Sequence, residues 1–163
     1  MEVVKEFNFM KKVKDDNNKW GYKGIDDKKV IVELKYDYVG DLQHGGFITT
    51  KIGNLWGIIQ IKYEKVKQIC EERYNYISSF KNEYATVLKE TGYNFINQEG
   101  NELFDQDFTE IMQRLPGDLA IVRRDNLFGV VCLSTGKEVY PCTYTAITTC
   151  GKKIKLQQEF VIR

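Results

Sequence analysis

The sequence predicts an all-β protein built from about four tandem repeats of short antiparallel strands. The first observation is a regular spacing of aromatic residues that follow a polar turn and open an apolar run: Trp20, Trp56, Tyr93 and Phe128. These lie 36, 37 and 35 residues apart, counted from 20 to 56, from 56 to 93 and from 93 to 128. A constant period in this range indicates a repeat architecture. The second observation is that apolar residues inside each repeat alternate with a period of two, as in half-buried strands.

Two further segments recur in step with these aromatic residues. One is an aromatic residue, then a polar residue, then a variable residue and an aliphatic one, at residues 35–39, 73–77, 107–111 and 143–147. The other is a short apolar strand pattern at residues 47–51, 84–88, 119–123 and 154–156. Three segments in register over four copies support the repeat.

We expect four repeats within a single domain spanning residues 1–163. The predicted repeats cover residues 18–53, 54–90, 91–124 and 125–160, and a cap strand precedes them at about 7–14. The second repeat illustrates the elements, with strands expected near 56–61, 66–70, 74–80 and 84–89. Gly, Asn and Asp residues between the runs suit tight hairpin turns. A closed, propeller-like ring and an open rolled array both bury the apolar face of each repeat against its neighbours.

The repeated segments resemble the WG β-repeats of the KWG type. Lys19-Trp20-Gly21 and Trp56-Gly57 match that pattern closely, and Phe128-Gly129 keeps its Gly. Tyr93-Asn94 departs from it, because Asn replaces Gly. The resemblance extends from about Phe7 to the end of the chain. It implies an array of short β-strands and no catalytic residues.

Composition argues against several classes of protein. The chain has 24 basic and 23 acidic side chains, so bulk attraction to phosphate is not expected to dominate its binding. Neither an apolar leader at the N-terminus nor an apolar run long enough to span a membrane is present in the sequence. We therefore expect a cytoplasmic protein that does not bind membranes.

Candidate catalytic and metal-binding residues are sparse. The single histidine, His44, lies in a Gly-containing loop, where we expect it to be exposed rather than catalytic. The four cysteines form no C-x-x-C pair and fit small buried residues better than a zinc site: Cys70, Cys132, Cys142 and Cys150. The sequence therefore predicts no enzyme activity, no cofactor and no metal.

Two sets of residues are candidates for partner binding. A basic column is expected where equivalent strands end, at Lys51, Lys89, Arg123 and Arg124. Such charges also serve to keep strand edges soluble. The second set is exposed tyrosines, with Tyr36 and Tyr74 as the candidates, because tyrosine is frequent at interfaces and stacks on ligands. The four aromatic residues that define the repeat are expected to be buried structural anchors.

The predicted function is that of a non-catalytic binding module whose partner is a protein. One alternative is a small inhibitor of a nucleic-acid enzyme, such as an anti-CRISPR that a mobile element uses against host defence. A second alternative is a nucleic-acid or small-ligand binder that uses the basic column and the exposed tyrosines. The sequence does not indicate the oligomeric state.

Overall fold

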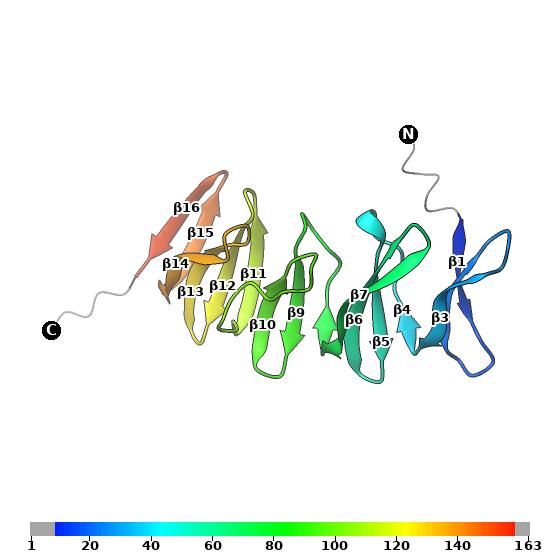
Figure 1. Ribbon diagram of the computed structural model, residues 1–163. Helices are drawn as coiled ribbons and strands as arrows, with labels where there is room; N and C mark the ends of the chain where they lie inside the picture. Colours follow the sequence, from blue (N-terminus) through cyan, green and yellow to red (C-terminus); the bar gives the residue numbers. More distant parts are fainter. Residues whose placement is uncertain (1–8, 159–163) are drawn as a thin grey trace. The chain divides into compact units, whose positions relative to one another are not determined.

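The computed structural model describes residues 9–158 and is built of strands in small antiparallel sheets (Figure 1). The all-β prediction is therefore confirmed. The strands of the first half are β1 (Met10–Lys14), β2 (Trp20–Gly24), β3 (Val30–Tyr36), β4 (Tyr38–Val39), β5 (Phe47–Ile52), β6 (Leu55–Lys62), β7 (Lys65–Tyr74) and β8 (Tyr76–Ile77). Those of the second half are β9 (Ala85–Lys89), β10 (Gly92–Ile96), β11 (Glu110–Leu115), β12 (Leu119–Arg124), β13 (Leu127–Cys132), β14 (Lys137–Tyr144), β15 (Ala146–Cys150) and β16 (Lys153–Gln157). A 3-10 turn, η1, covers His44–Gly46.

The chain forms two compact units. Unit 1 is Met1–Phe80 with Gln98–Gly100, and unit 2 is Lys81–Asn97 with Asn101–Arg163. The expectation of a single domain stays a prediction. Within residues 9–158, β1 pairs only with β2 and β16 only with β15, so no ladder joins the two end strands. In the same residues, no helix has the length and apolar character needed to cross a membrane.

Each of the two four-stranded sheets combines strands from two successive sequence repeats. The sheets have the orders β1-β2-β3, β4-β5-β6-β7, β10-β9-β8, β11-β12-β13-β14 and β15-β16. The chain leaves one sheet and enters the next at Asp37, between β3 and β4, and again at Thr145, between β14 and β15. These residues are the polar centres of the second recurring segment. That segment therefore marks the crossover between sheets.

The polar residue at a crossover also holds the next hairpin turn. The Asp37 carboxylate accepts a hydrogen bond from the Gly53 amide at 2.7 Å. The Thr109 hydroxyl accepts one from the Asp125 amide at 2.8 Å. Gly53 and Asp125 both have positive φ, at 59° and 55°. A short polar side chain at the crossover thus pairs an amide that the tight turn leaves without a ladder partner.

The glycine after the aromatic anchor lets a bulged strand approach closely. The pairs Trp56↔Tyr74 and Ile58↔Cys70 place one residue, Gly57, opposite three on β7. A Cβ on Gly57 would lie 2.7 Å from the carbonyl oxygen of Cys70. A Cβ on Gly21 would likewise lie 2.3 Å from the Val32 carbonyl oxygen, and one on Gly129 would lie 2.6 Å from the Tyr140 carbonyl oxygen. All three glycines that follow an anchor therefore permit a backbone approach that a side chain would block.

The third repeat replaces this bulged strand by a loop. Asn94 stands where the other repeats have Gly, and its side chain is fully buried. Its amide nitrogen donates to the Phe104 carbonyl at 2.8 Å, and its oxygen accepts from the amides of Phe95 and Phe104. β10 forms its ladder with β9, and the residues that follow β10 reach its other side through isolated bridges such as Tyr93↔Phe108. Four strands per repeat is therefore wrong for residues 91–124, because the Asn94 side chain supplies bonds that a ladder would make.

One predicted strand of the second repeat is also wrong. A strand was expected near 74–80, but Tyr74 ends β7 and only Tyr76–Ile77 form β8. The crossover at Asn75 breaks the run into two pieces that belong to different sheets. The predicted cap strand appears as β1 over Met10–Lys14, and its first expected residues, 7 and 8, lie outside the described residues.

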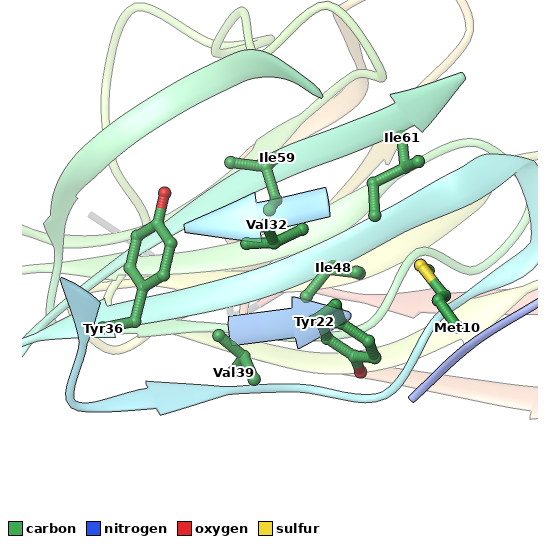
Figure 2. Close-up of a cluster of buried hydrophobic side chains, with 8 residues drawn as sticks. All are labelled: Met10, Tyr22, Val32, Tyr36, Val39, Ile48, Ile59 and Ile61. Carbon is green, nitrogen blue, oxygen red and sulfur yellow. The ribbon is translucent and has the colours of Figure 1, made fainter. Parts of the chain in front are cut away.

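Apolar side chains from successive sheets form the cores. In unit 1 the core combines residues of β1 to β6, as Figure 2 shows: Met10, Tyr22, Val32, Tyr36, Val39, Ile48, Ile59 and Ile61. In unit 2 a second core contains Phe95, Phe104, Phe108, Ala120, Val122, Val131 and Leu133. Each sheet is too small to be stable alone, so burial against a neighbouring sheet supplies the apolar driving force.

Candidate functional site

Every aromatic anchor lies directly across the sheet from a second aromatic residue. The pairs are Trp20↔Tyr36, Trp56↔Tyr74, Tyr93↔Phe108 and Phe128↔Tyr144. The anchors open their strands, as expected: Trp20 is the first residue of β2, and the other three are second in β6, β10 and β13. A cross-strand aromatic pair is therefore the shared structural unit of the four repeats.

In three of these pairs burial is the reverse of the prediction, and in the fourth both Phe128 and Tyr144 are half-buried. The four anchors are only half-buried. Their partners Tyr36, Tyr74 and Phe108 are 3%, 0% and 0% exposed. Burial raises the pKa of Tyr36 to about 12, with smaller contributions from nearby carboxylates. The expectation that Tyr36 and Tyr74 are exposed is wrong. The chain crosses to another sheet at Asp37 and at Asn75, so the tyrosine before each crossover is buried and the one after it, Tyr38 or Tyr76, is exposed.

An aromatic and basic surface patch in unit 1 is the best candidate for binding. We call Lys12, Tyr38, Lys51 and Trp56 the Tyr38 patch. Tyr38 is 43% exposed, and its ring meets that of Trp56 edge-on with 5.5 Å between centroids. The ammonium of Lys51 lies 5.3 Å from the Trp56 centroid. The patch therefore presents aromatic rings with cations over them.

The fourth member of the patch, Lys12, is paired with a carboxylate. The Lys12 ammonium lies 5.6 Å from the Tyr38 centroid and bonds to Asp41 at 2.7 Å. This bond lowers the pKa of Asp41, and the charge of Lys12 adds to the effect. Sequence reasoning missed the patch because it needs β1, β4, β5 and β6 to meet. Alternation gave no signal for choosing the outward tyrosine, because residues two apart share a face in an uninterrupted strand.

The predicted basic column does not occupy one position in the repeat. Lys51 faces Trp56, and Arg123 faces Phe128, so these two are equivalent. In the third repeat Tyr93 faces Leu88, and Lys89 lies one residue further along, opposite Gly92. Arg124 is likewise one residue past Arg123. Adjacent strand residues point to opposite faces, so the expected single stripe is wrong.

The three candidate cations of unit 2 are paired with carboxylates. Lys89 bonds to Glu102 at 2.7 Å and to Asp107 at 2.9 Å. Arg124 bonds to Glu138 at 2.7 Å, and Arg123 bonds to Glu110 at 3.0 Å. Burial lowers the pKa of Lys89, but the two carboxylates more than offset this, and its pKa is raised overall. These cations contribute to the local structure of the sheet rather than to a free positive surface.

The remaining candidate residues show no catalytic arrangement. His44 is exposed in η1, as expected. Cys70 is buried, whereas Cys150 is exposed, so the expectation of buried cysteines is wrong for Cys150. Among residues 9–158, no group of three His, Cys, Asp or Glu side chains could hold a metal ion.

Comparison with known proteins identifies the repeat. Residues 20–56 match the family model described as WG containing repeat. The match runs from one anchor, Trp20, to the next, Trp56, and includes the bulge opposite Gly21 and the crossover at Asp37. None of the curated proteins compared with the chain matches it in sequence. The chain therefore contains the WG β-repeat that its sequence predicts.

Proposed function

We propose that this β-repeat module binds a protein partner and that the Tyr38 patch is the centre of the contact. The observation that carries the proposal is the exposed Tyr38 ring between the Trp56 ring and the Lys12 ammonium. Aromatic residues dominate the centres of protein interfaces, and lysine belongs to their rims. A half-buried Trp56 also gives a rigid contact surface at little cost in side-chain entropy.

The pairing of charged side chains favours a protein partner over a nucleic acid. Binding to phosphate requires several cations free to displace counterions. In the Tyr38 patch Lys12 already bonds to Asp41, and in unit 2 Lys89, Arg123 and Arg124 have carboxylate partners. These four cations therefore already have carboxylate partners. A partner surface that offers apolar contacts at its centre and a few carboxylates near Lys51 fits this arrangement.

Affinity capture with matched variants tests the proposal. The tagged full chain and its Tyr38→Ala variant are compared on a native-host lysate, with Tyr140→Ala as the control because Tyr140 is 38% exposed in unit 2. We expect a defined protein to be retained by the wild type and by the control, and lost with Tyr38→Ala. Retention should persist at high salt, since the contact is mainly aromatic. Loss of capture after nuclease treatment, or equal capture by Tyr38→Ala, contradicts the proposal.

A further inference from the structure

Unit 1 contains a cavity that the Tyr38 patch does not use. Its volume is about 510 Å³, within the range of small-molecule sites. It is lined by Phe9, Met10, Leu42, His44, Gly45, Gly46, Gln60, Ile61, Lys62, Tyr63 and Glu64. Along the β5–β6 hairpin, Gln60 faces Phe47 and Trp56 faces Lys51. The cavity and the patch are thus four residues apart along each strand, about 13 Å at the usual rise.

The cavity has an apolar floor and a polar rim. Met10 and Ile61 are each 7% exposed and lie at the same end of the unit 1 core, away from Tyr36 (Figure 2). Phe9 and Leu42 pack against the same core and are partly exposed. The rim carries His44, Gln60 and the turn from Lys62 to Glu64. An apolar floor with a few polar groups at the edge is typical of small-molecule sites.

The η1 loop is held close to β6 beside this floor. The Gln60 side-chain amide donates to the Gly45 carbonyl at 2.9 Å. A Cβ on Gly46 would lie 2.2 Å from the Ile61 carbonyl oxygen, and Gly46 has φ of 84°. Only glycine permits this approach. The loop that carries His44 is therefore fixed at the rim. The side-chain oxygen of Gln60, Oε1, can accept a hydrogen bond from a ligand.

Tyr63, at the rim of the cavity, has an unfavourable backbone conformation. It forms a two-residue turn with Glu64, closed by the pair Lys62↔Lys65, and the two residues have φ of 52° and 58°. Turns of this kind favour Asn-Gly or Asp-Gly, and a bulky residue with positive φ is uncommon. The chain itself uses Asn82 at the first position of its Asn82-Glu83 turn. Among the described residues with positive φ, Tyr63 is the only aromatic one.

The ring of Tyr63 does not stabilise the fold by burial, since it is 84% exposed. Strained residues that persist without a packing role concentrate at functional sites. We propose that this cavity binds a small neutral molecule with a planar ring, which packs over Met10 and Ile61 and against the Tyr63 ring. The rim holds one cation, Lys62, and one anion, Glu64, so it gives neither an anionic nor a cationic ligand a net advantage. His44 and Gln60 supply the hydrogen bonds.

Titration of the isotope-labelled full chain with indole, followed by NMR, tests this proposal. We expect saturable shifts in the backbone amides of residues 44–46 and 60–64. Tyr63→Asn should weaken indole binding by about tenfold, the scale of one lost stacking contact. The same variant should raise the melting temperature, because Asn suits positive φ better than Tyr. Tyr63→Phe should keep the affinity.

The controls separate this site from the partner-binding patch. Tyr76→Asn removes a different exposed tyrosine, 48% exposed, and should leave indole binding unchanged. Tyr38→Ala should also bind indole normally, so that failure of the proposed function and failure of the cavity proposal are distinguishable. The proposal is overturned by absence of saturable binding to the wild type or by unchanged affinity in Tyr63→Asn. Tighter binding of indole-3-acetate or tryptamine than of indole overturns the neutral-ligand assignment.

Discussion

The α-carbon of Gly57 lies against the bulged strand β7, so close that a Cβ there would be 2.7 Å from the carbonyl oxygen of Cys70. Backbone on the opposite strand cannot move as a flexible side chain can. The contact explains the glycine of the WG pair in physical terms: the anchor strand must let the next strand bulge toward it. It also indicates which substitutions each repeat tolerates.

Gly57→Ala should destabilise the protein by about 1–3 kcal/mol, the usual cost of forcing an extra methyl group into a packed site. Gly53→Asn is the matched control. Gly53 has open space around its α-carbon and φ of 59°, which Asn tolerates. Urea unfolding monitored by circular dichroism measures both. Equal stability of Gly57→Ala and wild type would show that the bulge is not constrained by this contact.

Asn94→Ala should destabilise the third repeat by about 2 kcal/mol or more, because it leaves the buried Phe95 and Phe104 amides without an acceptor. Asn94→Gly restores the residue of the other repeats and should be no better, since the loop has no bulged strand to take the space. Asn101→Ala, at an exposed position of the same loop, serves as a comparison. The prediction is contradicted if Asn94→Gly is as stable as the wild type.

Within the cross-strand pair of the second repeat, Tyr74 should contribute more to stability than Trp56. Tyr74 is 0% exposed and its hydroxyl accepts a bond from Arg73 at 2.9 Å, so Tyr74→Ala should cost about 3–5 kcal/mol. Trp56 is half-buried, and Trp56→Ala should cost clearly less. Thermal and urea unfolding of the two variants gives the order. A larger loss for Trp56→Ala would make the anchor, not its partner, the core residue.

The stability of unit 2 should depend on acidic pH through Asp107. Burial opposes its ionisation, but hydrogen bonds from Thr91, Asn94 and Lys89 prevail and lower its pKa. The unfolded chain, with a pKa of about 3.9, then binds more protons than the folded one, so the stabilisation present above that value is lost as pH falls below it. Asp107→Asn should flatten this dependence, whereas the exposed Asp105→Asn should not. Unfolding followed between neutral and strongly acidic pH provides the measurement.

The repeat, its strand character and its aromatic anchors follow from the sequence, because period and alternation are properties of the chain itself. The spacing of Trp20 and Trp56 indicates one structural unit per interval. The glycines after the anchors mark the close approaches at Gly21, Gly57 and Gly129. The tight turns at Gly53 and Asp125 also follow from the sequence, because Gly and Asp tolerate positive φ.

Only the tertiary structure decided which face each residue presents and which strands share a sheet. Tyr36 is buried and Tyr38 is exposed because the chain crosses to the next sheet at Asp37, so the two residues belong to different sheets. Relative to the aromatic anchor, Lys89 is displaced by one residue from the position that Lys51 occupies, so the two side chains take opposite faces of their strands. The Tyr38 patch and the cavity beside Tyr63 each require elements distant in sequence to meet. Periodicity describes neighbours along a strand, whereas these sites depend on register between strands.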